Sequence, residues 1–354
     1  MATVVLPKVS WLILTPRCNN RCQQCYYGIE QFHSGDISTG DIELFMSLLK
    51  ELETENCVLI GGEPTLYPYL EDAIRIGRLQ GIKISIVTNG SVYANKNRLK
   101  TSLENGLHSY SVSIEGPNAK LHDFQTRREG SFTQATRAIV NGLELGARVA
   151  SITTISQTTK DSAMEIYQAM RSLGVSTIVY NVCTPSLDRS NRNCLLPIAE
   201  TAQILQNLFL ETLSDVESSK AKVKLVTPLP LCLFDPKLVP IMKKTGFLRQ
   251  GCGCQMFYGS GIALNFDGSI LPCCHWIGCS LGNIKTISGN QSFPKPEDFK
   301  AWWFKKEPSV FRQRLISYPS QRCQNCQFWG NSCVGGCPLL WLEFNASECI
   351  PDNR

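Results

Sequence analysis

Three cysteines near the start of the chain are spaced closely enough to hold one metal centre. Cys18, Cys22 and Cys25 are separated by three and then two residues. The thiolate of cysteine is a soft ligand that suits zinc and iron–sulfur clusters. Three thiolates can hold three irons of a [4Fe–4S] cube and leave the fourth iron open, whereas structural zinc needs four ligands. The spacing favours an iron–sulfur cluster, and zinc with a distant fourth ligand is the alternative.

The whole chain has 17 cysteines in 354 residues, and many of them occupy its C-terminal part. The first residues are apolar and strand-like, without the charged leader of a secretory signal, so we expect a cytoplasmic protein. In a reducing cytosol, clustered cysteines bind metals more often than they form disulfides. The downstream candidates for metal ligands are Cys252, Cys254, Cys273, Cys323, Cys326, Cys333, Cys337 and Cys349.

Strands and helices alternate along the N-terminal part of the chain. Short, apolar, β-branched segments at 9–14, 57–60, 82–87, 109–114, 150–155 and 177–182 are typical of buried parallel strands. Apolar residues recur with helical spacing at 41–52, 132–145, 162–173 and 197–213. Six such units predict a parallel sheet with right-handed crossovers. The sequence therefore predicts an α/β fold, a partial (β/α)6 TIM-like barrel that is open on one side.

Polar and glycine-rich motifs follow the second, third and fourth predicted strands. They read GGEP at 61–64, TNG at 88–90 and SVSIEG at 111–116. In a β/α barrel the active site lies at the carboxyl ends of the strands. We therefore expect these motifs and the three cysteines after the first strand to share one rim.

The chain changes character after the predicted barrel, which spans residues 1–219. Residues 220–250 include the proline-rich TPLPLCLFDPKLVP, which argues against a long helix and is interpreted as a bridging segment. Residues 251–354 form the Cys-rich region. Asp267 and Gly268 stand between two alternating segments there and predict a β-hairpin with a tight type I′ turn.

Charge and hydropathy exclude some classes of function. The net charge is +5, which is mild for this length, and the small lysine clusters are interpreted as a solvated face. We expect no nucleic-acid partner. No apolar run reaches the roughly 18 residues that a membrane span requires, so we expect no membrane partner either.

These motifs together resemble the radical S-adenosylmethionine (SAM) superfamily. Its CX3CX2C signature stands here as CNNRCQQC at 18–25, and the motifs at 61–64, 88–90 and 113–115 match further family motifs. Each short motif is weak alone, but their shared position on one rim makes the combination specific. One residue departs from the pattern: the family usually has an aromatic residue before the third cysteine, and Gln24 stands there.

The resemblance implies a role for each motif. Cys18, Cys22 and Cys25 would hold the SAM-binding cluster. Glu63 would accept hydrogen bonds from the SAM amino group, and Ser113 and Glu115, two residues apart on one strand face, would hold the ribose. The implied cofactor-binding residues are Gly61, Gly62, Glu63, Asn89, Ser113, Glu115 and one of Arg127 and Arg128 for the SAM carboxylate.

The downstream cysteines resemble the SPASM extension found in many radical SAM maturases. Gly268-x4-Cys273 and the later run of cysteines fit its pattern, with one extra residue before Cys333. The resemblance implies two auxiliary [4Fe–4S] clusters and therefore three clusters in all; zinc knuckles are the alternative. The first auxiliary set would be Cys254, Cys273 and Cys337, joined by Cys252, by Cys274 or Cys279 in its place, or by no fourth ligand, which would leave one iron open. The second set would be Cys323, Cys326, Cys333 and Cys349.

Two residues outside these sets are also candidates. Cys183 ends the sixth predicted strand and should face the barrel mouth, where a thiol could donate a hydrogen atom to a substrate radical. A small buried residue is the alternative interpretation. His275, beside the cysteines at 273–274, is interpreted as a structural histidine.

The resemblance implies reductive cleavage of SAM to a 5′-deoxyadenosyl radical, which abstracts a hydrogen atom from the substrate. Modification of a peptide or protein side chain is the first hypothesis: a crosslink, a thioether, an epimerisation or an oxidation, with or without a separate recognition protein. Oxidation, epimerisation or rearrangement of a sugar, nucleoside or amino acid is the second. A non-catalytic redox module is the third. The electron donor would be a reductase or a flavodoxin-type protein.

Overall fold

The computed structural model describes residues 4–28, 35–249, 253–287, 295–316 and 319–344. Two of the expected cluster ligands, Cys252 and Cys349, lie outside these described residues.

A ten-stranded sheet organises the described chain, with the strand order β10-β9-β8-β1-β2-β3-β4-β5-β6-β7. Strands β1 to β7 are parallel and follow one another in chain order. The six predicted strands are all present, which confirms the α/β class and the parallel barrel-like sheet. The parallel strands are β1 Val9–Ile13, β2 Asn56–Ile60, β3 Lys83–Thr88, β4 Ser109–Ser113, β5 Val149–Ile155, β6 Thr177–Val182 and β7 Lys222–Leu225.

Alternating burial explains why these segments form strands. Side chains of β5 are alternately buried and half-buried along its whole length, as the two faces of a strand require. Apolar residues such as Leu12, Ile84 and Val112 are completely buried. Each buried side chain of this size contributes about 1.5–3 kcal/mol through removal from water. The core therefore lies between the sheet and the helices that cover it.

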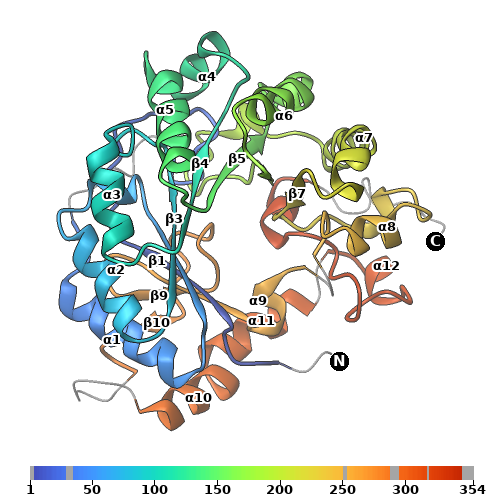
Figure 1. Ribbon diagram of the computed structural model, residues 1–354. Helices are drawn as coiled ribbons and strands as arrows, with labels where there is room; N and C mark the ends of the chain where they lie inside the picture. The colour runs from blue at the N-terminus through green and yellow to red at the C-terminus, as the bar shows by residue number, and fades with distance from the viewer. Residues whose placement is uncertain (1–3, 29–34, 250–252, 288–294, 317–318, 345–354) are drawn as a thin grey trace.

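Helices cover the outer face of the curved sheet. Figure 1 shows α1, α2, α3, α5, α6 and α7 on an arc around the strands in chain order, with α4 beside α5 at the top of the view. Ser38 caps the N-terminus of α1: its Oγ accepts a hydrogen bond from the Asp41 N–H at 3.1 Å. The helices are α1 Thr39–Glu51, α2 Leu70–Leu79, α3 Lys96–Glu104, α4 Ala119–Thr126, α5 Ser131–Glu144, α6 Ala163–Ser172 and α7 Ile198–Glu217, with short 3₁₀ turns η1 Pro64–Leu66, η2 Lys160–Ser162 and η3 Arg192–Cys194.

The predicted hairpin is present and adds to the edge of the same sheet. Strand β8 (Gly261–Leu264) pairs in parallel with β1, and β9 (Ser269–Leu271) pairs antiparallel with β8. The short strand β10 (Gly282–Asn283) pairs with β9. The parallel contact with β1 was not predicted, because it joins segments that are far apart in the chain.

The turn of this hairpin differs from the prediction. The N–H of Asn265 donates to the Ser269 carbonyl at 2.8 Å, and the N–H of Gly268 donates to the Asn265 carbonyl at 2.9 Å. A type I′ turn needs positive φ at both central residues, and of Asp267 and Gly268 only Gly268 has it, at 83°. The connection is therefore a three-residue loop with glycine at its left-handed position, and the type I′ prediction was wrong.

The expected bridging segment, 220–250, contributes structure of its own. It holds β7, which pairs with β6, then η4 (Leu231–Leu233) and α8 (Val239–Lys244). The helix α8 is short, in agreement with the prolines. The strand β7 therefore lies in the barrel sheet, although its residues fall within the expected bridging segment. The boundaries 219 and 250 between the expected domains stay a prediction.

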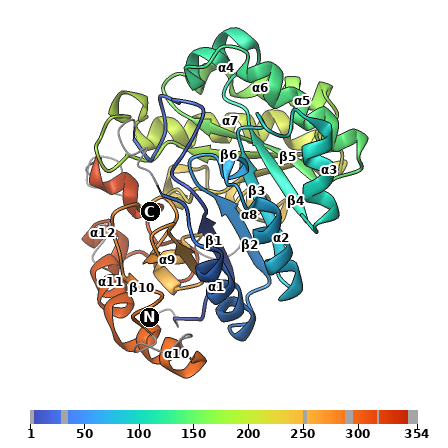
Figure 2. The same ribbon diagram turned by 90° about the vertical axis from the view of Figure 1, so that its left-hand side faces the viewer.

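The rest of the described chain consists of short helices beside the β1 end of the sheet. Figure 2 shows the orange and red segments gathered on that side. They comprise α9 Gln255–Tyr258, α10 Pro296–Lys305, α11 Glu307–Ile316, α12 Gln321–Gln324 and η5 Pro338–Leu342. The indole of Trp303 is almost fully buried and donates to the Val5 carbonyl at 3.1 Å, so this region is fastened to the first described residues of the chain.

Candidate functional site

The loop that carries the first three cysteines follows β1 at the carboxyl end of the sheet. Its backbone turns tightly: the N–H of Cys25 donates to the Cys22 carbonyl at 3.2 Å, and the N–H of Gly28 donates to the Cys25 carbonyl at 3.1 Å. The loop is also tied to α4, since Arg21 donates from its N–H to the Thr126 carbonyl at 3.0 Å. The three cysteines are thus held in one compact, well-anchored segment.

The thiols of this loop are chemically suited to a cationic metal centre. Burial raises the pKa of Cys18 to about 12, and the nearby Glu63 carboxylate adds to the shift. Burial, followed by the charges of Cys25 and Cys18, raises the pKa of Cys22. Such thiols keep their protons until a metal replaces them. Three soft donors that influence one another's ionisation fit the cluster expected here.

Among the residues that the structure describes, no three His, Cys, Asp or Glu side chains converge on a single ion. A [4Fe–4S] cube binds each cysteine through a different iron. Its ligands therefore surround the cluster and do not meet at one point.

The two glycines after β2 allow the backbones of two loops to touch. A Cβ on Gly62 would lie 2.4 Å from the carbonyl oxygens of Pro16 and Arg17, and one on Gly61 would lie 2.4 Å from the Thr15 carbonyl. In addition, the Gly62 N–H donates to the Thr15 carbonyl at 2.8 Å. The close approach expected at these glycines is thus made, in this structure, to the loop that leads into Cys18.

Glu63 is buried, with 1% of its surface exposed, and its carboxylate joins the ends of β2 and β3. Its Oε1 accepts from the hydroxyls of Thr65 and Thr88, both at 2.6 Å, and its Oε2 accepts from the Asn89 N–H at 2.6 Å. Burial still raises the pKa of Glu63 despite these donors. A buried carboxylate in this position gains from a cationic ligand such as an ammonium group.

Asn89 connects the end of β3 to the cysteine loop. Its Nδ2 donates to the Asn19 Oδ1 at 2.7 Å and lies 3.9 Å from the Cys18 Sγ, while its Oδ1 accepts from the Ser91 N–H at 2.9 Å. The structure therefore brings Asn89, Glu63 and Cys18 together on one rim.

Glu115 belongs to a chain of buried polar groups that the sequence did not reveal. Its Oε2 accepts from the Thr154 N–H at 3.1 Å, and the Gln24 side chain hydrogen-bonds to the same carboxyl group. Gln24 in turn accepts at Oε1 from the Gln125 amide at 2.7 Å, and Gln125 accepts from the Thr158 hydroxyl at 2.6 Å. Burial raises the pKa of Glu115 to about 7.

This network explains what Gln24 does at a position that is usually aromatic in the resembled family. Gln24 and Gln125 are both buried, and buried amides need partners, which each supplies to the other. Glu115 follows Ser113, the last residue of β4, which is half-buried at the same rim. No local sequence signal marks Gln125, because its partner lies about a hundred residues away.

The two adjacent arginines point to different neighbours. The Arg128 Nη1 donates to the Asn20 Oδ1 at 3.1 Å, and its Nη2 donates to the Gln134 side chain. Asn20 belongs to the cysteine loop, where its N–H donates to the Cys18 Sγ at 3.4 Å. Arg127 is exposed, with a left-handed backbone at φ 52°, and its charge acts on Cys194. Of the two arginines, Arg128 is therefore the one that hydrogen-bonds to the cysteine loop.

Cys183 lies directly after β6 and is buried, in the position expected at the barrel mouth. Its Sγ is 3.8 Å from the Gln24 carbonyl oxygen, and the Asn191 Nδ2 is 3.8 Å from the same sulfur. Burial raises the pKa of this thiol, and nearby Glu115 adds to the shift. Cys183 thus faces the first cysteine loop as a protonated thiol.

Three downstream cysteines form a group beside α9. Burial raises the pKa of Cys337, and the charges of Cys254 and Cys273 raise it further. The pKa of Cys273 is lowered, first by a hydrogen bond from the Cys274 thiol and then by backbone N–H groups. These neighbours place Cys254, Cys273 and Cys337 in one group, as expected for the first auxiliary set.

A second downstream group surrounds α12. Burial raises the pKa of Cys323 to about 11, and nearby Cys333 and Cys326 contribute. The turn is held by the Cys326 N–H, which donates to the Cys323 carbonyl at 3.0 Å, and the Gly335 N–H donates to the Cys333 Sγ at 3.3 Å. The structure thus gathers three of the four residues expected in the second auxiliary set.

In the described part of the chain, no helix is both long and apolar enough to cross a membrane.

Comparison with known proteins agrees with this geometry. Residues 12–185 match the family model described as the radical SAM superfamily. The chain is 30% identical over 176 residues to GTP 3′,8-cyclase of Aquifex aeolicus, covering 48% of this chain and 54% of that protein. It is 24% identical over 337 residues to the antilisterial bacteriocin subtilosin biosynthesis protein AlbA of Bacillus subtilis, covering 94% of this chain and 67% of AlbA.

A further similarity, to the AdoMet-dependent heme synthase of Oleidesulfovibrio alaskensis, covers 48% of this chain and 43% of that protein at 25% identity. The chain thus spans about half the length of the first curated relatives it matches.

Solved structures with this fold extend over nearly the whole chain. The structure of anSMEcpe with bound AdoMet covers 94% of this chain and 90% of its own, with a TM-score of 0.68 and 19% identity. The structure of Streptococcus suis SuiB bound to S-adenosylmethionine covers 99% of this chain and 77% of its own, with a TM-score of 0.70 and 16% identity. These likenesses establish the fold of both the barrel and the C-terminal region.

Proposed function

This chain belongs to the radical SAM superfamily and has a C-terminal region of the SPASM type, and from that premise we propose that it cleaves SAM reductively and modifies a peptide or protein side chain. The observation that carries the proposal is the shared rim. The cysteine loop after β1, Glu63 after β2, Asn89 after β3 and Glu115 after β4 occupy the carboxyl end of one parallel sheet.

The bound cluster and SAM would supply a 5′-deoxyadenosyl radical that abstracts a hydrogen atom from the substrate. The protein's task is to hold these groups and to exclude water. Cys18, Cys22 and Cys25 would hold the cluster. Their tight turn and the backbone contact with Gly62 keep the loop in a fixed position relative to the rim.

The rim residues would orient SAM through its polar groups. Glu63 offers a buried carboxylate to the amino group, and Asn89 lies beside it. Ser113 and Glu115 would hold ribose hydroxyls. Arg128, which contacts the cysteine loop through Asn20, is assigned to the SAM carboxylate, because a guanidinium suits a carboxylate in charge and shape.

Cys183 is proposed as a hydrogen donor. It is a buried, protonated thiol that faces the cysteine loop, so it could pass a hydrogen atom to a substrate radical without first losing a proton. A structural role for this small buried residue is the alternative.

The downstream groups are proposed as ligands of two auxiliary [4Fe–4S] clusters. Cys254, Cys273 and Cys337 would serve the first, with Cys252 as the expected fourth ligand. Cys323, Cys326 and Cys333 would serve the second, with Cys349 as the expected fourth ligand. Such clusters would accept or relay an electron, and a reductase or flavodoxin-type protein would supply the electron for SAM cleavage.

The extent of the similarities supports a peptide substrate. AlbA, whose name refers to bacteriocin biosynthesis, matches 94% of this chain, and the structure of SuiB with its precursor peptide SuiA covers 98%. The cyclase and heme synthase relatives match 48%. The region beyond the barrel is thus shared with proteins whose names or titles refer to peptide products or substrates.

A small-molecule substrate is the second candidate, because the 30% identity to GTP 3′,8-cyclase exceeds the 24% identity to AlbA. The two candidates are separated by the compound that stimulates turnover. Anaerobically reconstituted protein with SAM and dithionite is incubated with GTP or with a short peptide encoded beside its gene. The proposal expects the peptide to raise 5′-deoxyadenosine formation and to change mass; stimulation by GTP alone would favour the second candidate.

A further inference from the structure

A buried amide joins the Cys183 thiol to the first cysteine loop. Asn191 lies after β6, at the end of the loop 184–191, and only 1% of its surface is exposed. Its Nδ2 donates to the Thr184 carbonyl at 2.8 Å and to the Gln24 carbonyl at 3.3 Å, and it lies 3.8 Å from the Cys183 Sγ. This side chain therefore contacts the thiol, the residue after it and the loop of the first three cysteines.

The amide of Asn191 is itself fixed within its loop. Its Oδ1 accepts from the Ser186 N–H at 2.9 Å and from the Ser186 hydroxyl at 3.1 Å. The orientation of an amide is assigned from such partners, and a backbone N–H requires the oxygen to face it. The Nδ2 is therefore the atom that faces Cys183, and its two hydrogens serve the carbonyl groups and the sulfur.

The loop 184–191 is attached to the C-terminal region by ion pairs. The Arg189 Nε lies 3.1 Å from the Glu343 Oε1, and the Nε of Arg192, the first residue of η3, lies 3.4 Å from the Glu343 Oε2. The Glu343 side chain is only 5% exposed, so these pairs are less screened by solvent than pairs at the surface. Asn191, between the two arginines, thus stands on a segment anchored at both sides.

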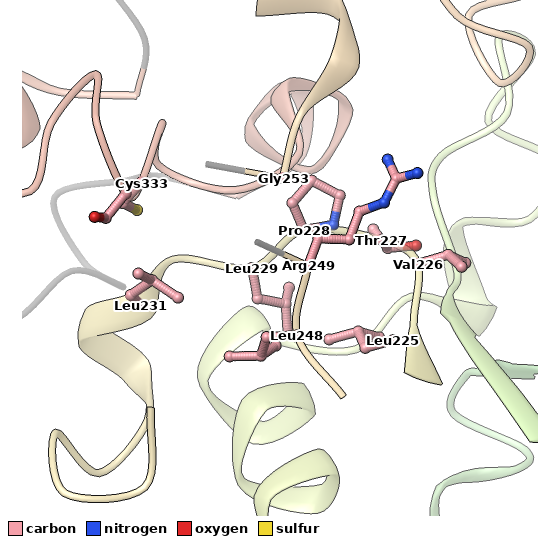
Figure 3. A pocket seen from close by; sticks show the side chains of 11 residues that line it. Leu225, Val226, Thr227, Pro228, Leu229, Leu231, Leu248, Arg249, Gly253 and Cys333 are labelled. Atoms are coloured by element: carbon pink, nitrogen blue, oxygen red, sulfur yellow. The ribbon is translucent and has the colours of Figure 1, made fainter. Parts of the chain in front are cut away.

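The backbone on which the thiol stands is held as well. The Cys183 N–H donates to the Ile155 carbonyl at 2.9 Å. Thr227, which lines the pocket at the end of β7 (Figure 3), accepts at its Oγ1 from the Val182 N–H at 3.0 Å. Because this backbone is fixed, the freedom left to the thiol is rotation about its side-chain bonds, among a few staggered positions.

We propose that Asn191 is a positioning residue that directs the hydrogen of the Cys183 thiol. The sulfur accepts from the Asn191 amide and donates to the Gln24 carbonyl, which is also 3.8 Å away. Together these two contacts select one rotamer of the thiol, with its hydrogen toward the first cysteine loop. The inference rests on the proposed function, in which Cys183 donates a hydrogen atom.

The step that depends on this orientation is a hydrogen-atom transfer. The S–H bond of Cys183 breaks homolytically and a C–H bond forms at the substrate radical, which leaves a thiyl radical on the sulfur. One electron from the reductant, which is dithionite in the assay, and one proton from solvent restore the thiol. Transfer between two groups requires a close and aligned approach, so a thiol in another rotamer would leave the substrate radical without its hydrogen.

Infrared spectroscopy of the cluster-free protein tests the contact without any substrate. Each protein is compared with the same protein carrying Cys183→Ala, and the difference isolates the S–H stretching band of Cys183. In Asn191→Ala this band should broaden and move to higher frequency, because the thiol is no longer held on the Gln24 carbonyl. A band that keeps its wild-type position and width in Asn191→Ala would overturn the inference.

A second buried asparagine provides the matched control. Asn141 is 4% exposed, and its Nδ2 donates to the Tyr93 carbonyl at 2.9 Å and to the Ala94 carbonyl at 3.0 Å. Asn141→Ala therefore also removes a buried amide that bonds two backbone carbonyls, but one without a contact to the thiol. It should leave the Cys183 band in place; an equal shift in both alanine variants would mean that general loosening of the fold moves the band, and would overturn the inference.

Turnover of the reconstituted full chain, with the short peptide encoded beside its gene, tests the role of the contact. Asn191→Ala should lower the ratio of product to 5′-deoxyadenosine by about 5- to 10-fold, the change that loss of one hydrogen bond implies, at unchanged iron content. Combined with Cys183→Ala it should lower the ratio no further, because it acts through that thiol. An unchanged ratio in Asn191→Ala, or a further loss in the double variant, would overturn the inference.

Asn191→Ser provides a second variant in case the alanine variant does not fold. The serine hydroxyl can bond within the loop but is too short to reach the Cys183 sulfur, so the same changes in band and ratio are expected. Normal product from Cys183→Ala would reject the hydrogen donor, which is a failure of the proposed function. Normal product from the Asn191 variants beside a defective Cys183→Ala would overturn this inference alone.

Discussion

The ring of Tyr26 stacks on the imidazole of His275, with centroids 4.4 Å apart and an angle of 27° between the planes. Tyr26 follows Cys25 in the first cysteine loop, and His275 follows Cys273 and Cys274. Burial lowers the pKa of His275 to about 4 and raises that of Tyr26, so both rings are neutral near pH 7. An uncharged, half-buried aromatic pair therefore links the first cysteine loop to the segment that carries Cys273 and Cys274.

The two glycines after β2 give the first prediction. Gly62→Ala should displace the cysteine loop, because the new Cβ would meet the backbone oxygens of Pro16 and Arg17 at 2.4 Å. We expect a loss of about 1–3 kcal/mol in stability and of the SAM-cluster iron after reconstitution. Gly40→Ala is the matched control, since its Cβ would meet nothing closer than 3.9 Å. Equal iron content and melting temperature in the two variants would contradict this account of the loop.

The adjacent arginines give the second prediction. Arg128→Gln should weaken SAM binding by about 10- to 100-fold, the range expected for loss of a charged hydrogen bond. Arg127→Gln should leave the affinity nearly unchanged, because Arg127 is exposed and its charge acts on Cys194. Equilibrium binding of SAM to each reconstituted variant measures this. The reverse order of effects would assign the carboxylate to Arg127.

Glu115 gives a prediction about pH. Its pKa is raised by burial from the usual 4.5 to about 7, so the folded state binds a proton that the unfolded state releases at lower pH. The stability that this carboxyl contributes is complete below about pH 4.5 and is lost as the pH rises through 7. Between these limits the loss is on the order of 3 kcal/mol.

The measurement is urea unfolding of the cluster-free protein at several pH values. Wild type should lose stability between about pH 5 and pH 8 relative to Glu115→Gln, which cannot ionise. If the two proteins follow parallel curves over this range, the carboxyl group of Glu115 has an ordinary pKa and the prediction fails.

The separation along the chain between interacting residues decides how much of this site could be predicted. The strands and the positions of Glu63 and Glu115 were predictable, because alternation and short motifs act over a few residues. The pairing of β8 with β1 was not, since it depends on packing between distant segments. The same reason hid the Gln24–Gln125 contact, in which each residue is an ordinary polar side chain until the other is placed beside it.

The prediction of the hairpin turn failed for a different reason. Asp267 and Gly268 are compatible with two turn geometries, and the dipeptide alone does not distinguish them. The choice depends on which residues close the loop, and here Asn265 and Ser269 do so.

The thiol at the barrel mouth gives the fourth prediction. Cys183→Ala should still form 5′-deoxyadenosine in the presence of substrate but should stall before product, because the hydrogen donor is missing. Cys57→Ala, which removes a fully buried thiol from β2, serves as the control for loss of a core sulfur. Product and 5′-deoxyadenosine are measured together by mass spectrometry. Normal product formation by Cys183→Ala would reject the donor role and leave a structural one.

The central claim is that Cys18, Cys22 and Cys25 hold a cluster that cleaves SAM. The most direct test is anaerobic reconstitution of the wild-type chain, followed by SAM and dithionite and by chromatography of the nucleoside products. We predict 5′-deoxyadenosine from wild type and none from the variant with these three cysteines changed to alanine, which should contain about four fewer irons. A reconstituted wild-type protein that binds zinc in place of iron and releases no 5′-deoxyadenosine would contradict the claim.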